Sequence, residues 1–365
     1  MTPTGRTIGI LGGGQLGRML ALAAAPLGYR CHIFSPESNS PASEIGNLST
    51  VAEYTDEKAL EKFAKDVDII TYEFENVPVC ATEVVSSITA LHPSQKSLLI
   101  CRNRVKEKTF AQENKISVAP WLSVINRNAL TDAVKKIGTP CILKSSELGY
   151  DGKGQTIITS DKKNDLDNAW LTVGANDCIL EQKISFKKEI SVIIARDLLG
   201  NMKSYTPCEN IHKNGILDHT IAPILTKSLE INTAKNIATT IAKALDHVGV
   251  LCVELFVESN GNILLNEIAP RVHNSGHWTI EACGTSQFTQ HIRAITGLPL
   301  QEIYQHSSAL MKNLIGEDIS IASDLIKTKN AHVHLYGKKK TMPGRKMGHV
   351  TWLNPTNDIL KLYTS

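Results

Sequence analysis

The chain has 365 residues, of which 42% are hydrophobic and 21% are charged. This length provides enough apolar material for two or three buried cores, as in an ordinary globular protein. The net charge of +3 is too small to predict a nucleic-acid-binding surface. No apolar stretch reaches the roughly 18 residues of a membrane span, and no signal-peptide core is present. Eight cysteines without a Cys-x-x-Cys pair predict free thiols. We therefore expect a cytoplasmic protein with no nucleic-acid and no membrane partner.

Strand-like and helix-like segments alternate over the first hundred residues. The expected strands are Ile8–Leu11, Arg30–Ser35 and Val67–Tyr72, and the expected helices are Leu16–Ala25 and Asp56–Lys65. Because such alternation is typical of parallel strands joined by helical crossovers, the sequence predicts a parallel sheet with helices on both faces.

The pattern changes after a helical connector expected over Arg102–Asn114. The strands expected beyond it are Cys141–Lys144, Gly154–Thr159, Cys178–Gln182 and Glu189–Ala195, and the helices are Lys162–Val173, Leu229–His247 and Ser286–Thr296. After Gly297 the segments become shorter and richer in turn signals. The sequence thus predicts three structurally different regions.

A glycine-rich loop, Gly12–Gly17, lies directly after the first strand and opens the first helix. It fits the pattern G-x-G-x-x-G, and Glu37 follows twenty residues later, as in dinucleotide-binding proteins. A nicotinamide-dependent oxidoreductase is therefore one hypothesis. Backbone N–H groups at a helix N-terminus suit any phosphate, however, and a tight turn without a ligand is a further alternative.

The most informative segment is a predicted hairpin near residue 260. Asn260-Gly261 is a strong signal for a two-residue turn, which pairs Ser259 with Asn262. Counting outward along both strands then puts Glu254 directly opposite Glu267. Two facing carboxylates repel, so either one is protonated or a cation lies between them. Oxygen ligands on a rigid hairpin suit Mg²⁺, whereas two solvated glutamates on an exposed face are the alternative.

A second glycine-rich loop, Gly149–Gly154, follows an apolar strand that ends in Lys144. A lysine at a strand end and a flexible loop with free backbone N–H groups can together cover nucleotide phosphates. The loop does not match G-x-x-x-x-G-K-[ST], so a P-loop NTPase is excluded. With the hairpin carboxylates, the lysine and the loop indicate phosphoryl transfer. The backbone of Ile179–Ile184 can bind an adenine edge or be an ordinary strand.

These residues follow one another in the order seen in ATP-grasp ligases, and the chain resembles that superfamily. Within it, the chain is similar to the N5-carboxyaminoimidazole ribonucleotide synthetase family over nearly its whole length. The motifs that carry this resemblance are GGGQLGRM (12–19), YEFENV (72–77), GYDGKGQ (149–155), NEIAPRVHNSGHW (266–278) and PGRKMGH (343–349).

The resemblance implies a mixed α/β fold with three domains. Residues 1–105 are expected to form a Rossmann-like domain with a parallel sheet, and residues 106–297 a two-lobed ATP-grasp domain. The small lobe of that domain is expected at about 118–180 and the larger lobe at about 181–297. Residues 298–365 are expected to form a small, β-rich C-terminal domain.

The resemblance also implies a reaction and its ligands. ATP, bicarbonate and 5-aminoimidazole ribonucleotide would give N5-carboxyaminoimidazole ribonucleotide, ADP and phosphate through carboxyphosphate, in purine biosynthesis. Mg²⁺ is the expected metal, with Mn²⁺ as a substitute, and a homodimer is the expected assembly. The alternatives are another ATP-grasp carboxylate–amine ligase and a non-catalytic nucleotide-binding relative. The catalytic base and the number of metal ions stay open.

Site residues are carried over only where this sequence matches the family's motifs. The metal ligands implied are Glu254 and Glu267, and the catalytic residues implied are Arg271, Asp151, Lys153 and His273. The residues implied to bind the nucleotide are Arg104, Lys144, Gly149, Tyr150, Asp151, Gly152, Lys153, Gly154, Gln155, Glu181, Gln182, Lys183, Ile184, Glu189, His212, Asn266 and Glu267. Those implied to bind the ribonucleotide are Gly14, Gln15, Leu16, Glu73, Tyr150, Asn274, Arg345 and Lys346.

Overall fold

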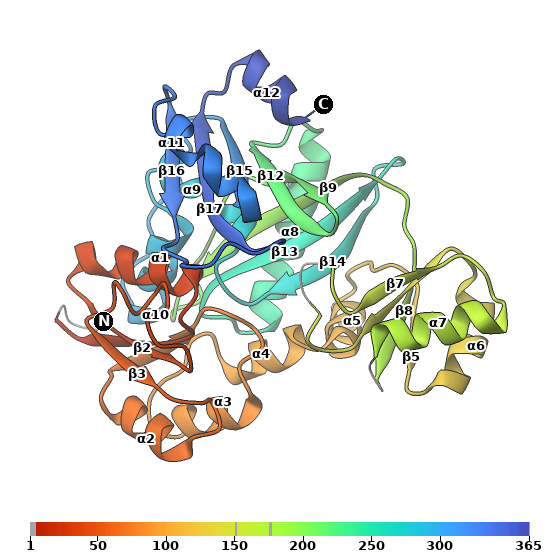
Figure 1. Cartoon of the computed structure of the whole chain (residues 1–365), viewed down its shortest axis with the longest axis horizontal. Helices are drawn as coiled ribbons and strands as arrows, with labels where there is room; N and C mark the ends of the chain where they lie inside the picture. The colour runs from red at the N-terminus through yellow and green to blue at the C-terminus, as the bar shows by residue number, and fades with distance from the viewer. Residues whose placement is uncertain (1–4, 150–151, 175–176, 365) are drawn as a thin grey trace.

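The chain folds around three β-sheets (Figure 1). The computed structural model describes residues 5–149, 152–174 and 177–364. Within these ranges, no helix has both the length and the apolar character needed to cross a bilayer. All eight cysteines are free thiols, and only Cys80 is exposed, in agreement with the sequence prediction.

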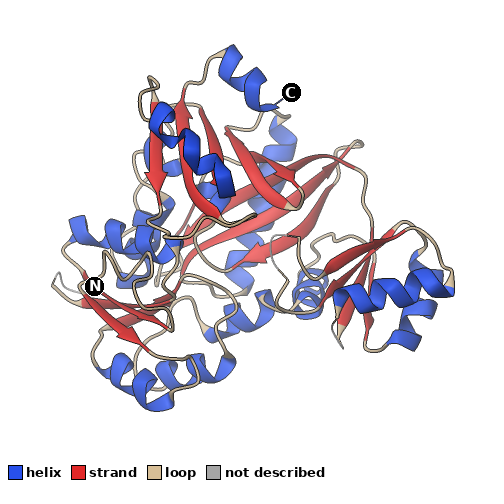
Figure 2. Cartoon of the chain, in the orientation of Figure 1, coloured by secondary structure: helices blue, strands red, loops and turns tan. Residues whose placement is uncertain are grey.

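The N-terminal sheet has four parallel strands in the order β3-β2-β1-β4. Their bounds are β1 Thr7–Leu11, β2 Arg30–Ser35, β3 Leu48–Val51 and β4 Ile69–Tyr72. The helices of this region are α1 Gln15–Ala24, η1 Ala25–Leu27, α2 Glu57–Lys65, α3 Val79–Ser86 and α4 Gln95–Cys101. Helices cover both faces of the sheet (Figure 2), which confirms the predicted parallel architecture. Strand β3 and helices α3 and α4 were not predicted.

A second, antiparallel sheet of four strands has the order β5-β8-β6-β7. The bounds are β5 Trp121–Val124, β6 Cys141–Ser145, β7 Gln155–Ile158 and β8 Cys178–Gln182. Helices α6 Arg127–Ile137 and α7 Lys163–Val173 pack against it through Leu130 and Leu166. Helix α5 Arg104–Glu113 precedes this small lobe and contacts the central sheet.

The central sheet has nine strands, in the order β14-β13-β9-β11-β12-β15-β17-β16 with β10 beside β9. The strand bounds are β9 Phe186–Arg196, β10 Met202–Ser204, β11 Cys208–Lys213, β12 Ile216–Ala222, β13 Gly249–Glu258, β14 Ile263–Ala269, β15 Ala309–Ile315, β16 Ala331–Leu335 and β17 Lys346–Leu353. The helices are α8 Ser228–Ala244, η2 Asn274–Gly276, α9 Thr279–Ala282, α10 Gln287–Thr296, η3 Gly316–Ile321, α11 Ala322–Leu325 and α12 Asn357–Thr364. The C-terminal region is β-rich as predicted, and its strands continue the central sheet because β12 pairs with β15.

The hairpin β13–β14 places Glu254 opposite Glu267 as predicted, but by a different route. The turn is not the predicted two-residue loop, because Glu258 N donates to Asn262 O (2.9 Å) and Val257 pairs with Ile263. The loop is therefore one residue longer than predicted. A β-bulge on the β14 side between residues 265 and 267 shifts the register back by one residue. The two differences compensate, so the pairing of the two glutamates is confirmed while the predicted turn is wrong.

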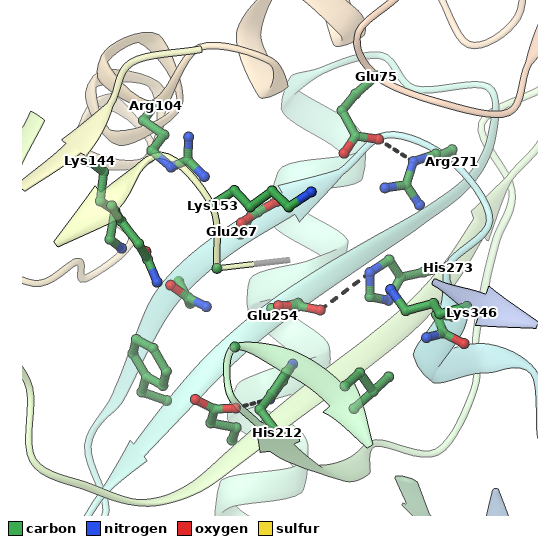
Figure 3. A pocket seen from close by; sticks show the side chains of 18 of the residues that line it. Glu75, Arg104, Lys144, Lys153, His212, Glu254, Glu267, Arg271, His273 and Lys346 are labelled. Carbon is green, nitrogen blue, oxygen red and sulfur yellow. Dashed lines mark hydrogen bonds and ion pairs between the residues drawn. The ribbon is translucent and has the colours of Figure 1, made fainter. Parts of the chain in front are cut away.

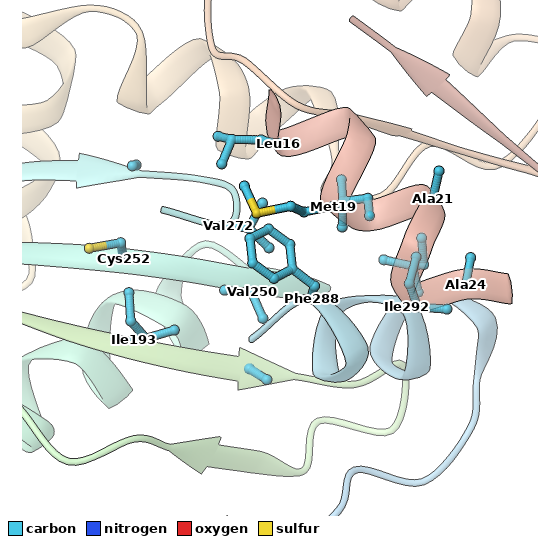
Figure 4. Packing of buried hydrophobic residues seen from close by; sticks show 14 of the residues in the cluster. Leu16, Met19, Ala21, Ala24, Ile193, Val250, Cys252, Val272, Phe288 and Ile292 are labelled. Atoms are coloured by element: carbon cyan, nitrogen blue, oxygen red, sulfur yellow. The ribbon is translucent and has the colours of Figure 1, made fainter. Parts of the chain in front are cut away.

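Helix α1 joins the N-terminal sheet to the central sheet (Figure 4). Its apolar side packs on α10, so that Met19 lies near Val272 and Phe288 in one continuous buried cluster. Because α1 begins at the glycine-rich loop, this packing fixes that loop relative to the strands of the central sheet. The beginning of α1 and the end of β14 are thereby held at one site.

Leu20 and Leu22 on α1 provide a matched test of how this buried cluster contributes to stability. Leu20 is fully buried, whereas Leu22 is 48% exposed. We expect Leu20→Ala to lower the free energy of unfolding by about 3 kcal/mol, because it removes buried methyl groups and leaves a cavity. Leu22→Ala should change it by less than about 1 kcal/mol. Urea denaturation followed by circular dichroism measures the free energy of unfolding of both variants. Equal losses would contradict a stabilising role for Leu20 in this cluster.

Two buried histidines also connect the N-terminal region to the central sheet. The His291 ring contacts Thr71 Oγ1 (2.8 Å) and accepts the N–H of Val250 (3.0 Å). His247 contacts Ser97 Oγ (3.2 Å) and the carbonyl of Val250 (3.1 Å). Burial lowers the pKa of His247 to about 4 and that of His291 to about 3.

These lowered pKa values predict a loss of stability in acid. The unfolded chain binds protons at histidine below about pH 6.5, whereas the folded chain does not until about pH 4 or lower. The stability is therefore complete above pH 6.5 and falls as the pH drops below it. We expect a loss of about 2 kcal/mol per histidine at pH 5. Urea midpoints at pH 7.5 and 5 test this for His247→Gln, which should reduce the pH dependence. His306→Gln, at an exposed histidine, is the control and should leave it unchanged.

Candidate active site

A cavity of about 380 Å³ lies where residues of the N-terminal region, the small lobe and the central sheet come together (Figure 3). Its lining mixes acidic and basic side chains with few apolar ones. The predicted site residues that line it are Gln15, Leu16, Arg104, Lys144, Gly152, Lys153, Gln155, Glu189, His212, Glu254, Asn266, Glu267, Arg271, His273, Asn274 and Lys346. Residues more than 300 positions apart in the sequence are thus brought to one site.

The carboxylate pair of Glu254 and Glu267 lies on the wall formed by the hairpin. Burial and the negative charge of Glu267 raise the pKa of Glu254 to about 7. A divalent cation between the two would relieve this repulsion, and carboxylate oxygens are the ligands that Mg²⁺ prefers. Donor atoms of Cys252, Glu254 and His273 also lie within 4.8 Å of one another. Because a thiol suits softer metals, the two glutamates fit Mg²⁺ or Mn²⁺ better.

Two residues of helix α5, Glu107 and Lys108, hold the bulge in β14 that positions Glu267. We call these two residues the bulge clamp. Lys108 Nζ donates to the carbonyl oxygens of Leu265 (3.2 Å) and Asn266 (2.7 Å). The carboxylate of Glu107 accepts the N–H of Ile268 (2.5 Å). These backbone groups flank the bulge, where the regular ladder is interrupted. Lys108 and Glu107 were not predicted as site residues, because their partners lie about 160 residues away in the sequence.

Three charged residues connect the small lobe to Lys108, and of these Glu181 and Lys108 are buried. Glu181 forms ion pairs with Lys144 (2.5 Å) and Lys108 (3.5 Å). Burial alone would raise the pKa of Glu181, but the two lysines outweigh it and hold the pKa at about 2. The predicted phosphate ligand Lys144 is therefore fixed at the cavity by a partner that is ionised at neutral pH.

The second glycine-rich loop lies over the cavity and is anchored by Arg104. The Arg104 guanidinium donates to the carbonyl oxygens of Ser145 (3.0 Å) and Gly149 (3.3 Å). Gly152 has a φ of +75°, and a Cβ there would lie 3.2 Å from Gly215 on the opposite wall. Glycine is needed at this position because the loop meets that wall through backbone. The predicted ligands Tyr150 and Asp151 lie outside the described residues.

The segment predicted to hold adenine has part of its backbone already engaged. The N–H of Gln182 donates to Pro120 O (2.8 Å), and that of Lys183 to Pro140 O (3.2 Å). Glu181, Gln182, Lys183 and Ile184 do not line the cavity, and neither do Gly149 and Gly154 of the second glycine-rich loop. Two aromatic rings that were not predicted, those of Phe186 and Phe256, do line it. They stack at 4.5 Å with an interplanar angle of 10°, and such rings can pack against a flat base.

Two further ion pairs orient groups at the cavity (Figure 3). Arg271 pairs with Glu75, and His212 pairs with Glu189. Burial alone would lower the pKa of Arg271, but Glu75 raises it, so the guanidinium stays charged. Glu75 was quoted within a sequence motif but was not predicted as a site residue. The sequence feature that could have identified Glu75 is its position two residues after Glu73, just beyond the end of strand β4.

A second cavity of about 330 Å³ adjoins the first, and Gln15 lines both. The predicted residues Gly14, Glu73 and Arg345 line the second cavity and not the first, together with Lys338, which was not predicted. Burial lowers the pKa of Lys338 to about 8, with a contribution from Arg345. The neighbouring residues Arg345 and Lys346 therefore face different cavities.

The first glycine-rich loop has its N–H groups occupied by a side chain of the same protein. Glu73 accepts the N–H of Gly14 (2.5 Å) and of Gly17 (2.8 Å). A Cβ at Gly14 would lie 2.4 Å from this carboxylate, so glycine makes room for it. Burial raises the pKa of Glu73, and the two hydrogen bonds offset part of this increase. A phosphate would have to displace Glu73 before it could bind these two groups.

Comparison with known families covers most of the chain. Residues 5–102 match the ribonucleotide synthetase preATP-grasp domain, residues 109–288 match the ATP-grasp domain, and residues 309–361 match the phosphoribosylaminoimidazole carboxylase C-terminal domain. The predicted fold class is thus confirmed. The domain boundaries at 105 and 297 stay predictions.

Comparison with single proteins gives the same result. The N5-carboxyaminoimidazole ribonucleotide synthase of Brucella melitensis is 46% identical over 96% of this chain and 97% of its own length. A solved ADP complex of N5-carboxyaminoimidazole ribonucleotide synthetase has a TM-score of 0.94 and 40% identity, covering 99% of this chain and 96% of the other. The Aspergillus clavatus N5-carboxyaminoimidazole synthase, solved with ADP and 5-aminoimidazole ribonucleotide, has a TM-score of 0.91 and 31% identity, covering 98% and 96%. Since these similarities extend over almost all of each protein, the chain belongs to the N5-carboxyaminoimidazole ribonucleotide synthase family.

Proposed function

We propose that the chain carboxylates 5-aminoimidazole ribonucleotide with bicarbonate at the expense of ATP, giving N5-carboxyaminoimidazole ribonucleotide, ADP and phosphate in purine biosynthesis. The observation that carries this proposal is the facing pair Glu254 and Glu267 in a cavity that also holds Arg104 and Lys144. Carboxylates for a divalent cation beside fixed positive charges suit a nucleotide triphosphate. Family membership supplies the substrate and replaces the oxidoreductase hypothesis for the first glycine-rich loop.

In this proposal the first cavity binds ATP. Glu254 and Glu267 would hold Mg²⁺, which neutralises phosphate charge during transfer of the γ-phosphoryl group to bicarbonate. Arg104 and Lys144 would contact phosphate oxygens. The stacked ring of Phe186 lies at the same cavity and would pack against the base. Arg271, whose charge Glu75 maintains, would stabilise the carboxyphosphate formed by this step.

The second cavity is proposed to bind the ribonucleotide. Lys338 and Arg345 provide positive charge for its 5′-phosphate, and Gln15 lies at the junction with the first cavity. A ligand bound there would extend its amine toward His273 and Asn274, which line the first cavity. The loop that contains Gly152 would exclude water from carboxyphosphate, which hydrolyses readily.

Three further expectations belong to this proposal. The assembly is proposed to be a homodimer, following the resemblance and the general frequency of two-fold assemblies. The location is proposed to be the cytoplasm, where free thiols such as those of this chain stay reduced. The proposed metal is Mg²⁺, with Mn²⁺ able to replace it at an oxygen-only site.

Glu267→Gln tests the proposed metal site directly. We expect phosphate release from ATP, Mg²⁺ and bicarbonate to increase strongly when 5-aminoimidazole ribonucleotide is added to the wild type. The variant should lose at least about 100-fold of this activity, since even residues that only orient metal ligands contribute about 10- to 100-fold. Glu258→Gln, at the end of strand β13 in the same hairpin, is the control. Full activity of Glu267→Gln would contradict the metal site, and stimulation only by another amine would contradict the substrate.

Lys108→Met tests whether the bulge clamp matters for metal binding. Loss of the Lys108 ammonium frees the carbonyl oxygens of Leu265 and Asn266, so Glu267 should be held less firmly. We expect the Mg²⁺ concentration for half-maximal activity to rise about 10- to 100-fold. Lys106→Met, at an exposed lysine on the same helix, is the matched control. An unchanged Mg²⁺ requirement in a correctly folded Lys108→Met protein would refute the role of the clamp.

A further inference from the structure

A chain of buried hydrogen bonds runs beneath the active site from strand β12 to the loop after β14. Thr220 Oγ1 donates to Asn210 Oδ1 (3.0 Å), and Asn210 Nδ2 donates to Ser191 Oγ (3.0 Å). Ser191 Oγ then donates to Ser275 Oγ (2.7 Å). Three of these side chains are fully buried, and Asn210 is 4% exposed. Ser191 Oγ also lies 3.1 Å from Cys208 Sγ, where either atom can donate, and the oxygen of Ser275 is the nearer of these two neighbours.

This chain ends at one nitrogen of the His273 ring. Ser275 Oγ lies 2.9 Å from His273 Nδ1, and the backbone N–H of Ser275 donates to the same nitrogen (3.3 Å). A backbone N–H group can only donate, so Nδ1 must carry a lone pair. The Ser275 hydroxyl accepts from Ser191, and its own proton is therefore available for Nδ1. The other polar neighbour of this hydroxyl, Cys252 Sγ, is farther away at 3.7 Å.

The neutral ring therefore carries its proton on Nε2, the nitrogen that faces the cavity. His273 Nε2 lies 3.4 Å from Glu254 Oε1, as the dashed line in Figure 3 shows. Arg271 and Lys346 line the cavity beside it. The N–H group thus already faces a carboxylate oxygen, and with Arg271 and Lys346 at the same cavity it suits a ligand oxygen that carries negative charge.

We propose that His273 acts as a hydrogen-bond donor to a carboxylate oxygen of carboxyphosphate, and that Ser275, Ser191, Asn210 and Thr220 are positioning residues that hold its ring in this tautomer. This inference rests on the proposed function, because that reaction supplies the oxyanion. It assigns to His273 a task different from that of a general base.

The carboxyl transfer does not require His273 to accept a proton. The amine nitrogen of the ribonucleotide forms a bond to the carboxyl carbon of carboxyphosphate, and the bond from that carbon to the bridging oxygen breaks. The amine proton leaves with the phosphate as hydrogen phosphate, and the product is the N-carboxylated amine. His273 keeps its own Nε2 proton throughout and stabilises negative charge on the carboxyl oxygens.

Substitution of His273 separates the two tasks. In His273→Gln the side-chain amide places an N–H group near the position of Nε2 but provides no base. We expect its kcat to stay within about tenfold of the wild type, whereas His273→Asn and His273→Ala lose about 10²- to 10³-fold, as for loss of one oxyanion donor. Equal loss in the Gln and Ala variants would overturn the donor role.

Ser275→Ala tests the positioning role with a readout that a purely structural defect would not change. In protein labelled with ¹⁵N-histidine, the resonances absent from His273→Asn identify the ring. We expect a protonated Nε2 and an unprotonated Nδ1 in the wild type, and a mixture of tautomers in Ser275→Ala. Its kcat should fall about tenfold with an unchanged KM for ATP, as for other residues that orient an imidazole. Cys252→Ala, which removes a buried neighbour of the same hydroxyl, is the control and should keep both values.

Failure of this inference differs from failure of the proposed function. If the wild type releases phosphate on addition of 5-aminoimidazole ribonucleotide but its His273 ring carries the proton on Nδ1, the tautomer assignment is overturned and the reaction stands. If the wild type shows no such stimulation, the proposed function fails, and with it the donor role of His273. The NMR measurement does not depend on catalysis and reports the tautomer in either case.

Discussion

The repulsion between two buried carboxylates is the constraint on which the rest of the site depends. Glu254 and Glu267 face each other across β13 and β14, and burial together with this proximity raises the pKa of Glu254 to about 7. A fold that holds such a pair is stable only if positive charge compensates it or if one group keeps its proton. The bulge that aligns the pair is held by Lys108, whose ammonium also forms an ion pair with Glu181. The geometry of the proposed metal site and the position of Lys144 are therefore parts of one ionic network.

Local sequence patterns predicted the elements of this network better than its connections. The pairing of Glu254 with Glu267 came from a turn signal at Asn260-Gly261, although the turn is one residue longer and a bulge restores the register. No local pattern indicates a bulge whose polar groups are satisfied by a helix about 160 residues earlier. For the same reason Glu75 and Phe186 were missed. Each gains its role from a partner in another element, through an ion pair or ring stacking.

The first glycine-rich loop illustrates a different limit of sequence reasoning. The motif correctly predicted a strand, a tight turn and a helix N-terminus with available N–H groups. Which anion meets these groups depends on tertiary structure, and here Glu73 from the end of the neighbouring strand β4 occupies two of them. The same backbone that suits a dinucleotide pyrophosphate in other proteins thus serves to hold a carboxylate beside the second cavity. A phosphate-binding fingerprint therefore identifies a geometry, and the residues that surround it decide the ligand.

The positions of the charged residues along the two cavities explain why the proposed reaction draws on residues from all three regions of the chain. In the proposed reaction, a reactive acyl phosphate must form near the proposed metal ligands Glu254 and Glu267 and then meet an amine before water does. These two glutamates lie on the β13–β14 hairpin, the proposed covering loop belongs to the small lobe, and the basic residues Lys338 and Arg345 lie near the beginning of β17. Gln15, at the start of α1, lies at the junction of both cavities. Because α1 is packed on α10 beside β13, the position of this junction is set by the hydrophobic core and not by the ligands. The two cavities are thus held at a fixed separation, which a transfer between two bound substrates requires.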